Sequence, residues 1–267
     1  MASKKISNNR YEAILDFIFQ SHYNNGEKEL LFDREEIAVA AKHLNIELPK
    51  NLGDLIYSFR YRVDLPATIR ASAPAGQEWI IEAAGRSKYL FKLVKISRIV
   101  PRPELMTIKI PDATPEIVLS YAQGDEQALL AKVRYNRLID IFLGITTYSL
   151  QNHLRTTVRG VGQIEIDELY IGLDRHGSHY VIPVQAKGGK DQLSVVQTAQ
   201  DLACCKEKFP SLVCRAVSAQ FMDDQRIAMF ELMIQDEQVK VVDEKHYKLM
   251  PASEISKSDL EIYRARI

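Results

Sequence analysis

The spacing of apolar residues in the first hundred positions predicts helices followed by strands. In the opening segment, apolar side chains recur at the 3.6-residue period of a helix, at Tyr11, Ile14, Leu15, Ile18 and Phe19. Asp33 stands three residues before Glu36, which is the spacing of a capping box and begins a second helix that runs to His43. A third helix is expected over about residues 52–62, and strands over residues 78–82 and 88–96.

A proline-rich segment divides the chain. Four prolines between Pro101 and Pro115 remove backbone donors and restrict the residues before them, so we predict an extended connector and two domains, residues 1–110 and 111–267. Beyond it the pattern predicts a helix over about 115–143 interrupted near Gly124, strands over 163–173 and 179–187, a helix over about 191–208, and strands over 212–219, 227–234 and 238–243. This mixture predicts an α/β or α+β fold with helices flanking a mixed sheet.

Charge is balanced over the whole chain but uneven along it. The formal net charge is +0, from 35 basic and 35 acidic residues, which argues mildly against DNA binding by the chain as a whole. Residues 54–102, however, hold nine Lys or Arg and four Asp or Glu. We expect contacts with DNA from the basic residues of this stretch, namely Arg60, Arg62, Arg86, Lys88 and Lys92. A solvated basic face without a ligand is the alternative interpretation.

Three short helices and a hairpin in this order resemble a winged helix-turn-helix module. The resemblance implies that residues 1–110 form a small DNA-binding domain. Its third helix, which ends near Arg60 and Arg62, would be the recognition helix that lies against duplex DNA.

Further features of the sequence bear on the cellular compartment of the chain and on its cofactors. It has no apolar run of about 18 residues and no signal-peptide pattern at its start, so we expect neither a membrane span nor secretion. Cys204, Cys205 and Cys214 lack the spacing of metal ligands and are expected to be buried thiols in a reducing cytoplasm. No GxxxxGK[ST] loop is present, so a nucleotide cofactor is not expected.

Polar residues in the two strands expected after residue 160 carry the candidate chemistry. Because side chains alternate along a strand, Glu165 and Asp167 share one face, and Glu168 points to the other. Gln185 and Lys187 also share a face, and a hairpin pairing would bring them close to Asp167. Carboxylates are ligands for Mg²⁺, and an adjacent lysine can orient water and stabilise negative charge during phosphodiester hydrolysis. The alternative is that these residues merely face solvent.

The combination of Asp167 with Gln185-Ala-Lys187 resembles the active site of the PD-(D/E)xK nuclease superfamily, which includes restriction endonucleases, Holliday-junction resolvases and RecB-like nucleases. Its signature is an acid on one strand and acid-x-Lys on the next. Asp167 matches the first acid and Lys187 the lysine, whereas Gln185 stands where the family usually has Asp or Glu. The predicted order of helix, strands, helix and strand over roughly residues 115–220 also agrees with the family core.

This resemblance implies a restriction-endonuclease-like fold and a Mg²⁺ site, with Mn²⁺ as a substitute. Asp167 and Gln185 would bind the cation, and Glu165, or Glu126 from the preceding helix, would supply the missing carboxylate. A bulge near residue 168 would instead turn Glu168 into the site.

The function expected from these patterns is Mg²⁺-dependent cleavage of double-stranded DNA by a type II restriction endonuclease. A homodimer is expected, since cutting both strands favours two-fold symmetry. Two alternatives stay open: a repair or recombination nuclease that recognises DNA shape, and a non-catalytic winged-helix regulator with a degenerate nuclease fold, to which Gln185 lends weight.

Overall fold

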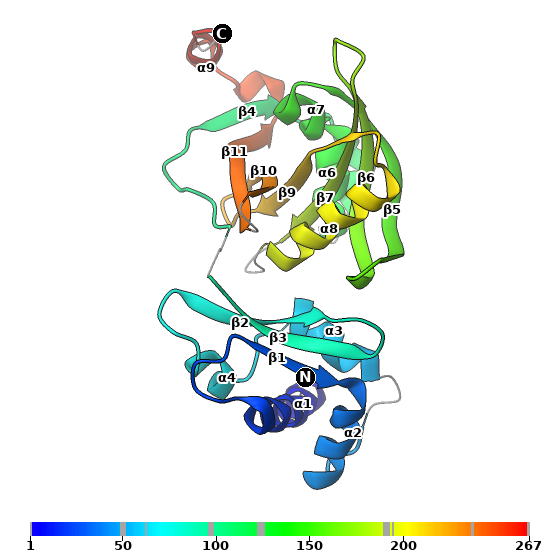
Figure 1. The fold of residues 1–267 in the computed structure, drawn as a ribbon. Coiled ribbons are helices and arrows are strands. Elements are labelled where there is room, and N and C mark those ends of the chain that lie inside the picture. The colour runs from blue at the N-terminus through cyan, green and yellow to red at the C-terminus, as the bar shows by residue number, and fades with distance from the viewer. Residues whose placement is uncertain are drawn as a thin grey trace. The chain divides into compact units, whose positions relative to one another are not determined.

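The computed structural model describes residues 2–48, 52–61, 63–95, 99–121, 126–188, 193, 195–235 and 238–265; the side chains of residues 2–9, 54, 61, 126 and 127 lie outside the description. The chain forms two compact units (Figure 1). Unit 1 comprises Met1–Ile96 and Thr157–Gln163, and unit 2 comprises Ser97–Thr156 and Ile164–Ile267. The proline-rich segment therefore belongs to unit 2.

Unit 1 combines helices with a three-stranded antiparallel sheet whose strand order is β1-β3-β2. Its elements are α1 (Ala2–His22), β1 (Glu29–Asp33), α2 (Arg34–His43), α3 (Leu52–Tyr61), α4 (Ala67–Ala71), β2 (Gln77–Ala83) and β3 (Lys88–Lys95). The expected capping box is confirmed, because Glu36 Oε1 accepts the Asp33 N–H at 2.8 Å at the start of α2. Strand β1 is an addition, since its few residues give too short a pattern to predict.

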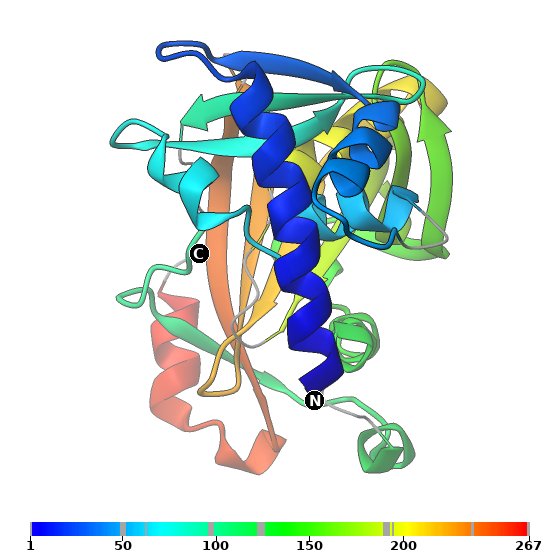
Figure 2. The same cartoon turned by 90° about the horizontal axis from the view of Figure 1, so that it is seen from below.

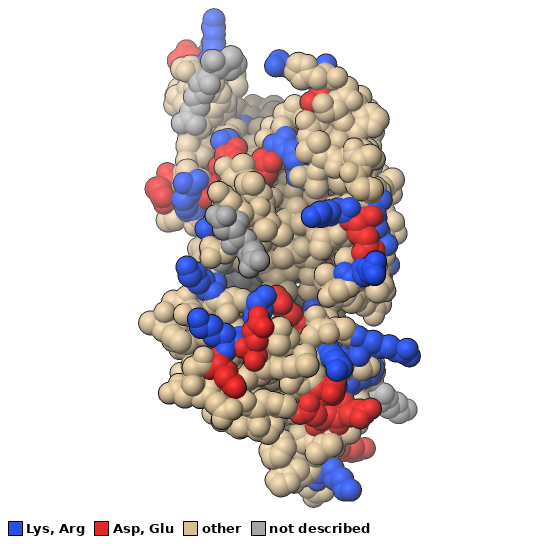
Figure 3. All heavy atoms as spheres, in the orientation of Figure 1, with Lys and Arg blue, Asp and Glu red and all other residues tan. Residues whose placement is uncertain are grey.

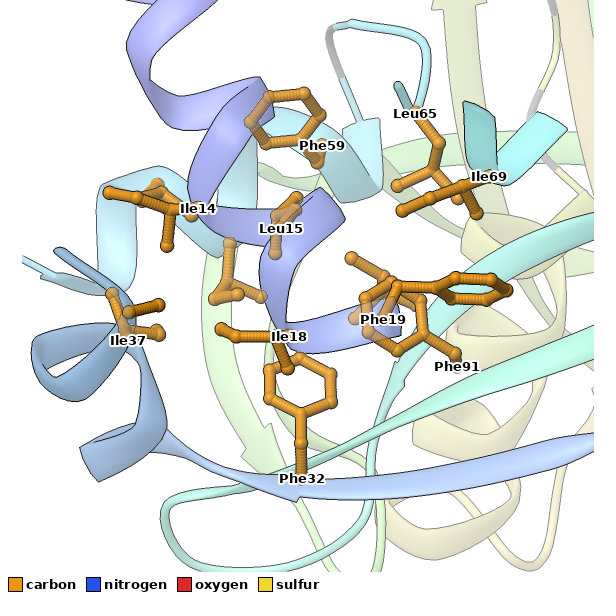
Figure 4. Packing of buried hydrophobic residues seen from close by; sticks show 14 of the residues in the cluster. Ile14, Leu15, Ile18, Phe19, Phe32, Ile37, Phe59, Leu65, Ile69 and Phe91 are labelled. Carbon is orange, nitrogen blue, oxygen red and sulfur yellow. The ribbon is translucent and has the colours of Figure 1, made fainter. Parts of the chain in front are cut away.

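The core of unit 1 lies between α1 and the sheet. Figure 2 shows α1 running across the strands, and Figure 4 shows its apolar residues meeting the aromatic side chains below them. Four of the residues that predicted this helix, Ile14, Leu15, Ile18 and Phe19, are at most 1% exposed. Phe19 meets Phe91 of β3 edge to face with ring centroids 5.2 Å apart. The helical spacing in the sequence thus predicts the buried face of α1 correctly.

Unit 2 is built on an eight-stranded mixed sheet flanked by helices, so the expected mixed α+β class is confirmed. The strand order is β4-β11-β10-β9-β7-β6-β5, with β8 also paired to β7. The strands are β4 (Thr107–Pro111), β5 (Thr146–Val158), β6 (Gly162–Leu173), β7 (His179–Lys187), β8 (Val213–Cys214), β9 (Ala216–Phe221), β10 (Arg226–Gln235) and β11 (Gln238–Met250). The β7–β9 and β11–β4 pairs are parallel, whereas β6–β7 and β9–β10–β11 are antiparallel.

A helix over about 115–143 with one interruption near Gly124 was expected, and its continuous course beyond that interruption is wrong. The described residues form α5 (Glu116–Tyr121), α6 (Glu126–Tyr135) and α7 (Leu138–Leu143). The break between α6 and α7 depends on contacts with residues distant in sequence, because the Asn136 side chain donates to Thr114 Oγ1 at 2.8 Å and accepts the Ala113 N–H at 2.7 Å. Arg137 then takes a left-handed backbone with φ of 50°, which ends α6. Gly124 lies outside the described residues.

Helices α6 and α8 cover opposite faces of the strands that carry the candidate chemistry. Residues of α6, among them Leu130 and Val133, pack with Val184 and Ala186 of β7. The other face meets α8 (Val195–Lys208), which is yellow in Figure 1 and contacts β7, β9 and β10. The alternating side chains of β7 therefore point in turn toward α6 and toward α8.

Strand β11 is followed by a short 3-10 turn (Ala252–Glu254) and by α9 (Lys257–Arg264). The Tyr263 hydroxyl accepts the Lys109 N–H of β4 at 2.9 Å, and Lys109 Nζ lies 2.8 Å from Asp259 Oδ2. These contacts bind α9 to the edge strand. Among the described residues, no helix is both long and apolar enough to cross a membrane.

Candidate active site

Strands β6 and β7 bring Asp167 beside the segment that contains Gln185 and Lys187. Their antiparallel register pairs Leu173 with His179 and continues without a shift to Glu168 and Val184. At the next step, Asp167 Oδ2 accepts the Ala186 N–H at 3.0 Å. The carboxylate thus binds the neighbouring strand where the regular ladder ends.

Gln185 faces α8 and forms a buried hydrogen bond with Asp201 of that helix. Gln185 Nε2 donates to Asp201 Oδ2 at 2.5 Å, and the two residues are 1% and 2% exposed. Burial raises the pKa of Asp201 well above its usual range, and the negative charge of Asp167 raises it further. Gln185 Oε1 and Asp201 Oδ1 have no hydrogen-bond partner among the described residues.

Asp201 is the site residue that sequence reasoning missed. Thr198, Asp201 and Cys205 are all buried and recur at helical spacing, so they mark the face of α8 that packs on the sheet. The signal in the sequence was an acid at one of these buried helix positions, because burying a carboxylate without a compensating partner costs free energy.

Lys187 is the last residue of β7 and Glu165 is the fourth residue of β6, and both are half-buried. The Glu165 carboxylate contacts two side chains of β5: Arg155 Nε lies 3.2 Å from one oxygen, and His153 Nδ1 lies 3.4 Å from the other. Gln197 Nε2 of α8 is 3.5 Å from the Glu165 carbonyl oxygen. The carboxylate of Glu165 is thus engaged with Arg155 and His153 of the neighbouring strand.

Glu168 lies on the opposite face of β6 from Asp167, as strand alternation predicts. It is completely buried and accepts hydrogen bonds from Arg134 Nε of α6 at 2.8 Å and from the Tyr170 hydroxyl at 2.7 Å. Burial, together with the charge of Glu168, raises the pKa of Tyr170. Because the β6–β7 register has no shift between Glu168 and Leu173, no bulge turns Glu168 toward α8.

Two of the expected residues lie outside the described part of the chain, namely the side chain of Glu126 and the whole of Arg62. Within the described part of the chain, no group of three or more His, Cys, Asp or Glu side chains is arranged to hold a metal ion. The cluster around Gln185 has two carboxylates, Asp167 and Asp201, with an amide as its third member.

The basic residues expected to contact DNA lie in unit 1 in different surroundings. Arg86, in the turn between β2 and β3, and Lys88, at the start of β3, are exposed, whereas Arg60 at the end of α3 is half-buried. Lys92 Nζ lies 3.5 Å from Glu82.

Acids also lie opposite the lysines of β3. Asp33 of β1 is the cross-strand partner of Lys88, and Glu29 is the partner of Lys92. On the face drawn in Figure 3, blue basic side chains are interspersed with red acidic ones. Lys88 and Lys92 thus have acids opposite them on β1, and Arg86 and Lys88 are exposed basic residues of this region.

Comparisons with known proteins leave the family of the chain open. No protein-family model matches it, and no solved structure matches it. A stretch of 72 residues, 27% of the chain, is 38% identical to an N-acetyl-D-glucosamine kinase of Erwinia tasmaniensis. The matched stretch covers 23% of that kinase. The similarity thus spans less than a quarter of the length of this relative, and it establishes no shared family.

Proposed function

We propose that the chain is a divalent-metal-dependent endonuclease that hydrolyses phosphodiester bonds of double-stranded DNA, with Mg²⁺ as cofactor. The observation that carries this proposal is the hydrogen bond from the Ala186 N–H to Asp167 Oδ2, 3.0 Å long, at the end of the β6–β7 ladder. Ala186 separates Gln185 from Lys187, so an acid, an amide and an ammonium group come from adjoining positions of two paired strands. Phosphodiester hydrolysis needs oxygen ligands for a cation and a positive group nearby.

The oxygen atoms around Gln185 fit a divalent cation. Gln185 Oε1 and Asp201 Oδ1 are buried acceptors without hydrogen-bond partners among the described residues, and such acceptors are costly unless a cation or water compensates them. Mg²⁺ and Mn²⁺ prefer ligands of this kind. When bound, the cation would polarise the phosphoryl group and make a water more acidic. Glu126 stays a predicted further ligand.

The protein's own groups would then have separate tasks. Asp167 and Gln185 would hold the cation through a carboxylate and an amide oxygen. Lys187 would orient a water molecule and stabilise negative charge on the phosphate oxygens. Glu165, predicted as a catalytic residue, contacts Arg155 and His153 in this structure, and we propose that it holds these two side chains where phosphate oxygens would meet them.

The arrangement of unit 2 supports a restriction-endonuclease-like fold for this activity. Helix α6 precedes β5, β6 and β7, helix α8 follows them, and β9 then pairs parallel with β7. This is the order of helix, strands, helix and strand that the sequence resemblance implies. Since β7 lies between β6 and β9, Gln185 and Lys187 belong to a central strand that is held on both sides.

Unit 1 supports duplex binding by a winged helix-turn-helix module. Its elements follow the order helix, strand, two helices, a short helix and a hairpin, and the first strand pairs with the hairpin in the sheet order β1-β3-β2. The turn of the hairpin carries Arg86 and precedes Lys88, both exposed. We propose that these side chains contact DNA phosphates, with Arg60 and Lys92 in supporting positions.

Digestion of a mapped plasmid tests the activity. With Mg²⁺ we expect discrete bands from the wild-type chain and a loss of at least about 100-fold in cleavage rate for Asp167→Ala. Asp224→Asn is the matched control, because Asp224 is an exposed acid in the turn between β9 and β10 of the same unit. Equal cleavage by wild type and Asp167→Ala would contradict the proposal.

Assays with other DNA substrates distinguish the two alternative functions. Cleavage of four-way junctions, with linear duplex left intact, would favour a structure-selective nuclease. A shift of duplex DNA on a gel, without cleavage in Mg²⁺ or Mn²⁺, would favour a non-catalytic regulator, for which the missing charge at Gln185 provides a reason.

We propose a homodimer for cutting both strands, and the mass in solution with and without duplex tests it.

A further inference from the structure

The buried contact between α8 and β7 carries an inference about a residue outside the sequence motif. We propose that Asp201 is a ligand of the divalent cation and supplies the negative charge that Gln185 lacks. The identity of the cation rests on the proposed nuclease function, but the ligand assignment rests on the side chains themselves.

The first argument is the pattern of hydrogen bonds in the Gln185–Asp201 pair. Their contact uses one atom of each side chain, Gln185 Nε2 and Asp201 Oδ2, at 2.5 Å. It leaves one oxygen on each side chain, and both oxygens are buried without a partner among the described residues. Buried polar groups that serve packing alone are normally satisfied. Two unsatisfied oxygens on contacting side chains are therefore available as ligands of a cation.

The second argument is the charge environment of Asp201. The side chain is 2% exposed, and no described Lys, Arg or His forms an ion pair with it. Among the charges that act on it, the carboxylate of Asp167 has the largest effect, and it is of the same sign. Two carboxylates that repel each other, one of them buried, favour binding of a divalent cation, because the cation compensates both charges.

The third argument is that the other acids nearby are already engaged. The Glu165 carboxylate lies 3.2 Å from Arg155, and Glu168 is bound by Arg134 on the α6 face of β6. Neither carboxylate has an unsatisfied buried oxygen, whereas Asp201 has one. Among the acids on β6, β7 and α8 whose side chains are described, Asp201 is therefore the best partner for Asp167.

Calorimetric titration of the full chain with Mn²⁺ alone, without DNA, tests the assignment. Asp201→Asn keeps the shape and the capacity to hydrogen-bond Gln185 but removes the charge. We expect it to weaken Mn²⁺ binding about tenfold or more, with no decrease in the melting temperature of the metal-free protein, since a buried carboxylate is lost. Asp224→Asn should bind Mn²⁺ as the wild type does.

A double variant moves the charge across the contact. Gln185→Glu combined with Asp201→Asn puts the carboxylate on β7 and the amide on α8, so we expect Mn²⁺ affinity within about threefold of wild type. A merely structural role for Asp201 predicts no loss in the single variant and no recovery in the double variant. Unchanged binding in Asp201→Asn, or a double variant as weak as Asp201→Asn, would overturn the assignment.

The single variant Gln185→Glu gives a further test, which does not depend on whether the Asp201 variant folds. Two carboxylates at hydrogen-bond distance should lower the melting temperature of the metal-free protein, and Mn²⁺ should then raise it more than in the wild type. An equal shift by Mn²⁺ in both proteins would contradict the assignment, as would a wild-type chain that binds no Mn²⁺.

The two proposals fail in different ways. Mn²⁺ binding that depends on Asp201, in a chain that cleaves no DNA, would refute the nuclease and support the metal site. DNA cleavage that Asp201→Asn leaves unchanged, with unchanged Mn²⁺ binding, would refute the role of Asp201 and leave the nuclease standing.

Discussion

Replacing Arg134 should open unit 2 around β6, because it leaves a completely buried carboxylate without its cation. Glu168 is 0% exposed, and Arg134 contacts it through Nε at 2.8 Å and through a second guanidinium nitrogen. Removing one partner of a buried ion pair typically costs about 3–5 kcal/mol. The Arg134 side chain is 38% exposed, so water screens the pair in part and the lower end, about 3 kcal/mol, applies.

Hydrogen exchange measured by mass spectrometry gives the required local measurement. A cost of about 3 kcal/mol corresponds to roughly 100-fold faster exchange of the β6 and β7 amides in Arg134→Ala, provided that exchange is limited by the opening equilibrium. Because the only tryptophan of the chain is Trp79, in unit 1, fluorescence would not report directly on this region.

A double-mutant cycle with Glu168→Gln isolates the pair. Once the carboxylate is an amide, loss of Arg134 should cost much less, so the two substitutions should be non-additive by about 1–3 kcal/mol. Additive effects, or an Arg134→Ala protein that exchanges within about threefold of wild type, would refute the reasoning that Glu168 depends on this cation.

Three further predictions concern other parts of the molecule. Phe91 is completely buried in the core of unit 1, so Phe91→Ala should cost about 3–5 kcal/mol in urea unfolding followed by tryptophan fluorescence; a cost below about 1 kcal/mol would contradict the packing. Contacts with Lys109 and Ser256 hold the pKa of Asp259 at about 2, below its usual value, so the stabilisation of α9 is present above about pH 4 and is lost as pH falls toward 2; proteolysis of α9 with an acid-tolerant protease should accelerate over that window in wild type and change less in Asp259→Asn. Arg86→Ala and Lys88→Ala should each weaken duplex binding and lower the salt dependence of the binding constant by about one unit, whereas an unchanged slope would exclude phosphate contacts.

The extent to which the fold could be predicted depends on how each element is buried. Helix α1 and the strands β6 and β7 were predictable, because one or both faces are packed and leave an apolar pattern in the sequence. Strand β5, over Thr146–Val158, was not predicted: it is the edge of its sheet and most of its side chains are exposed. The break after α6 was missed because it depends on the Asn136 side chain and residues 113 and 114, which are distant in sequence.

The candidate site was likewise predictable only in part. Strand alternation and an antiparallel hairpin brought Asp167 and Gln185 together in the sequence interpretation, because both follow from the two-residue period of a strand. The contact of Gln185 with Asp201 could not be predicted, since it depends on how α8 rotates about its axis when it packs on the sheet. The ion pairs of Glu165 likewise involve β5, which the sequence pattern did not reveal.

The most direct test of the central claim measures the rate of plasmid cleavage as a function of Mg²⁺ concentration for wild type, Asp167→Asn and the control Asp224→Asn. The account predicts cleavage that saturates with Mg²⁺ in the wild type and the control. For Asp167→Asn it predicts a maximal rate at least about 100-fold lower, together with a requirement for more Mg²⁺. Cleavage by Asp167→Asn with the rate and Mg²⁺ dependence of the wild type would contradict the assignment of this site.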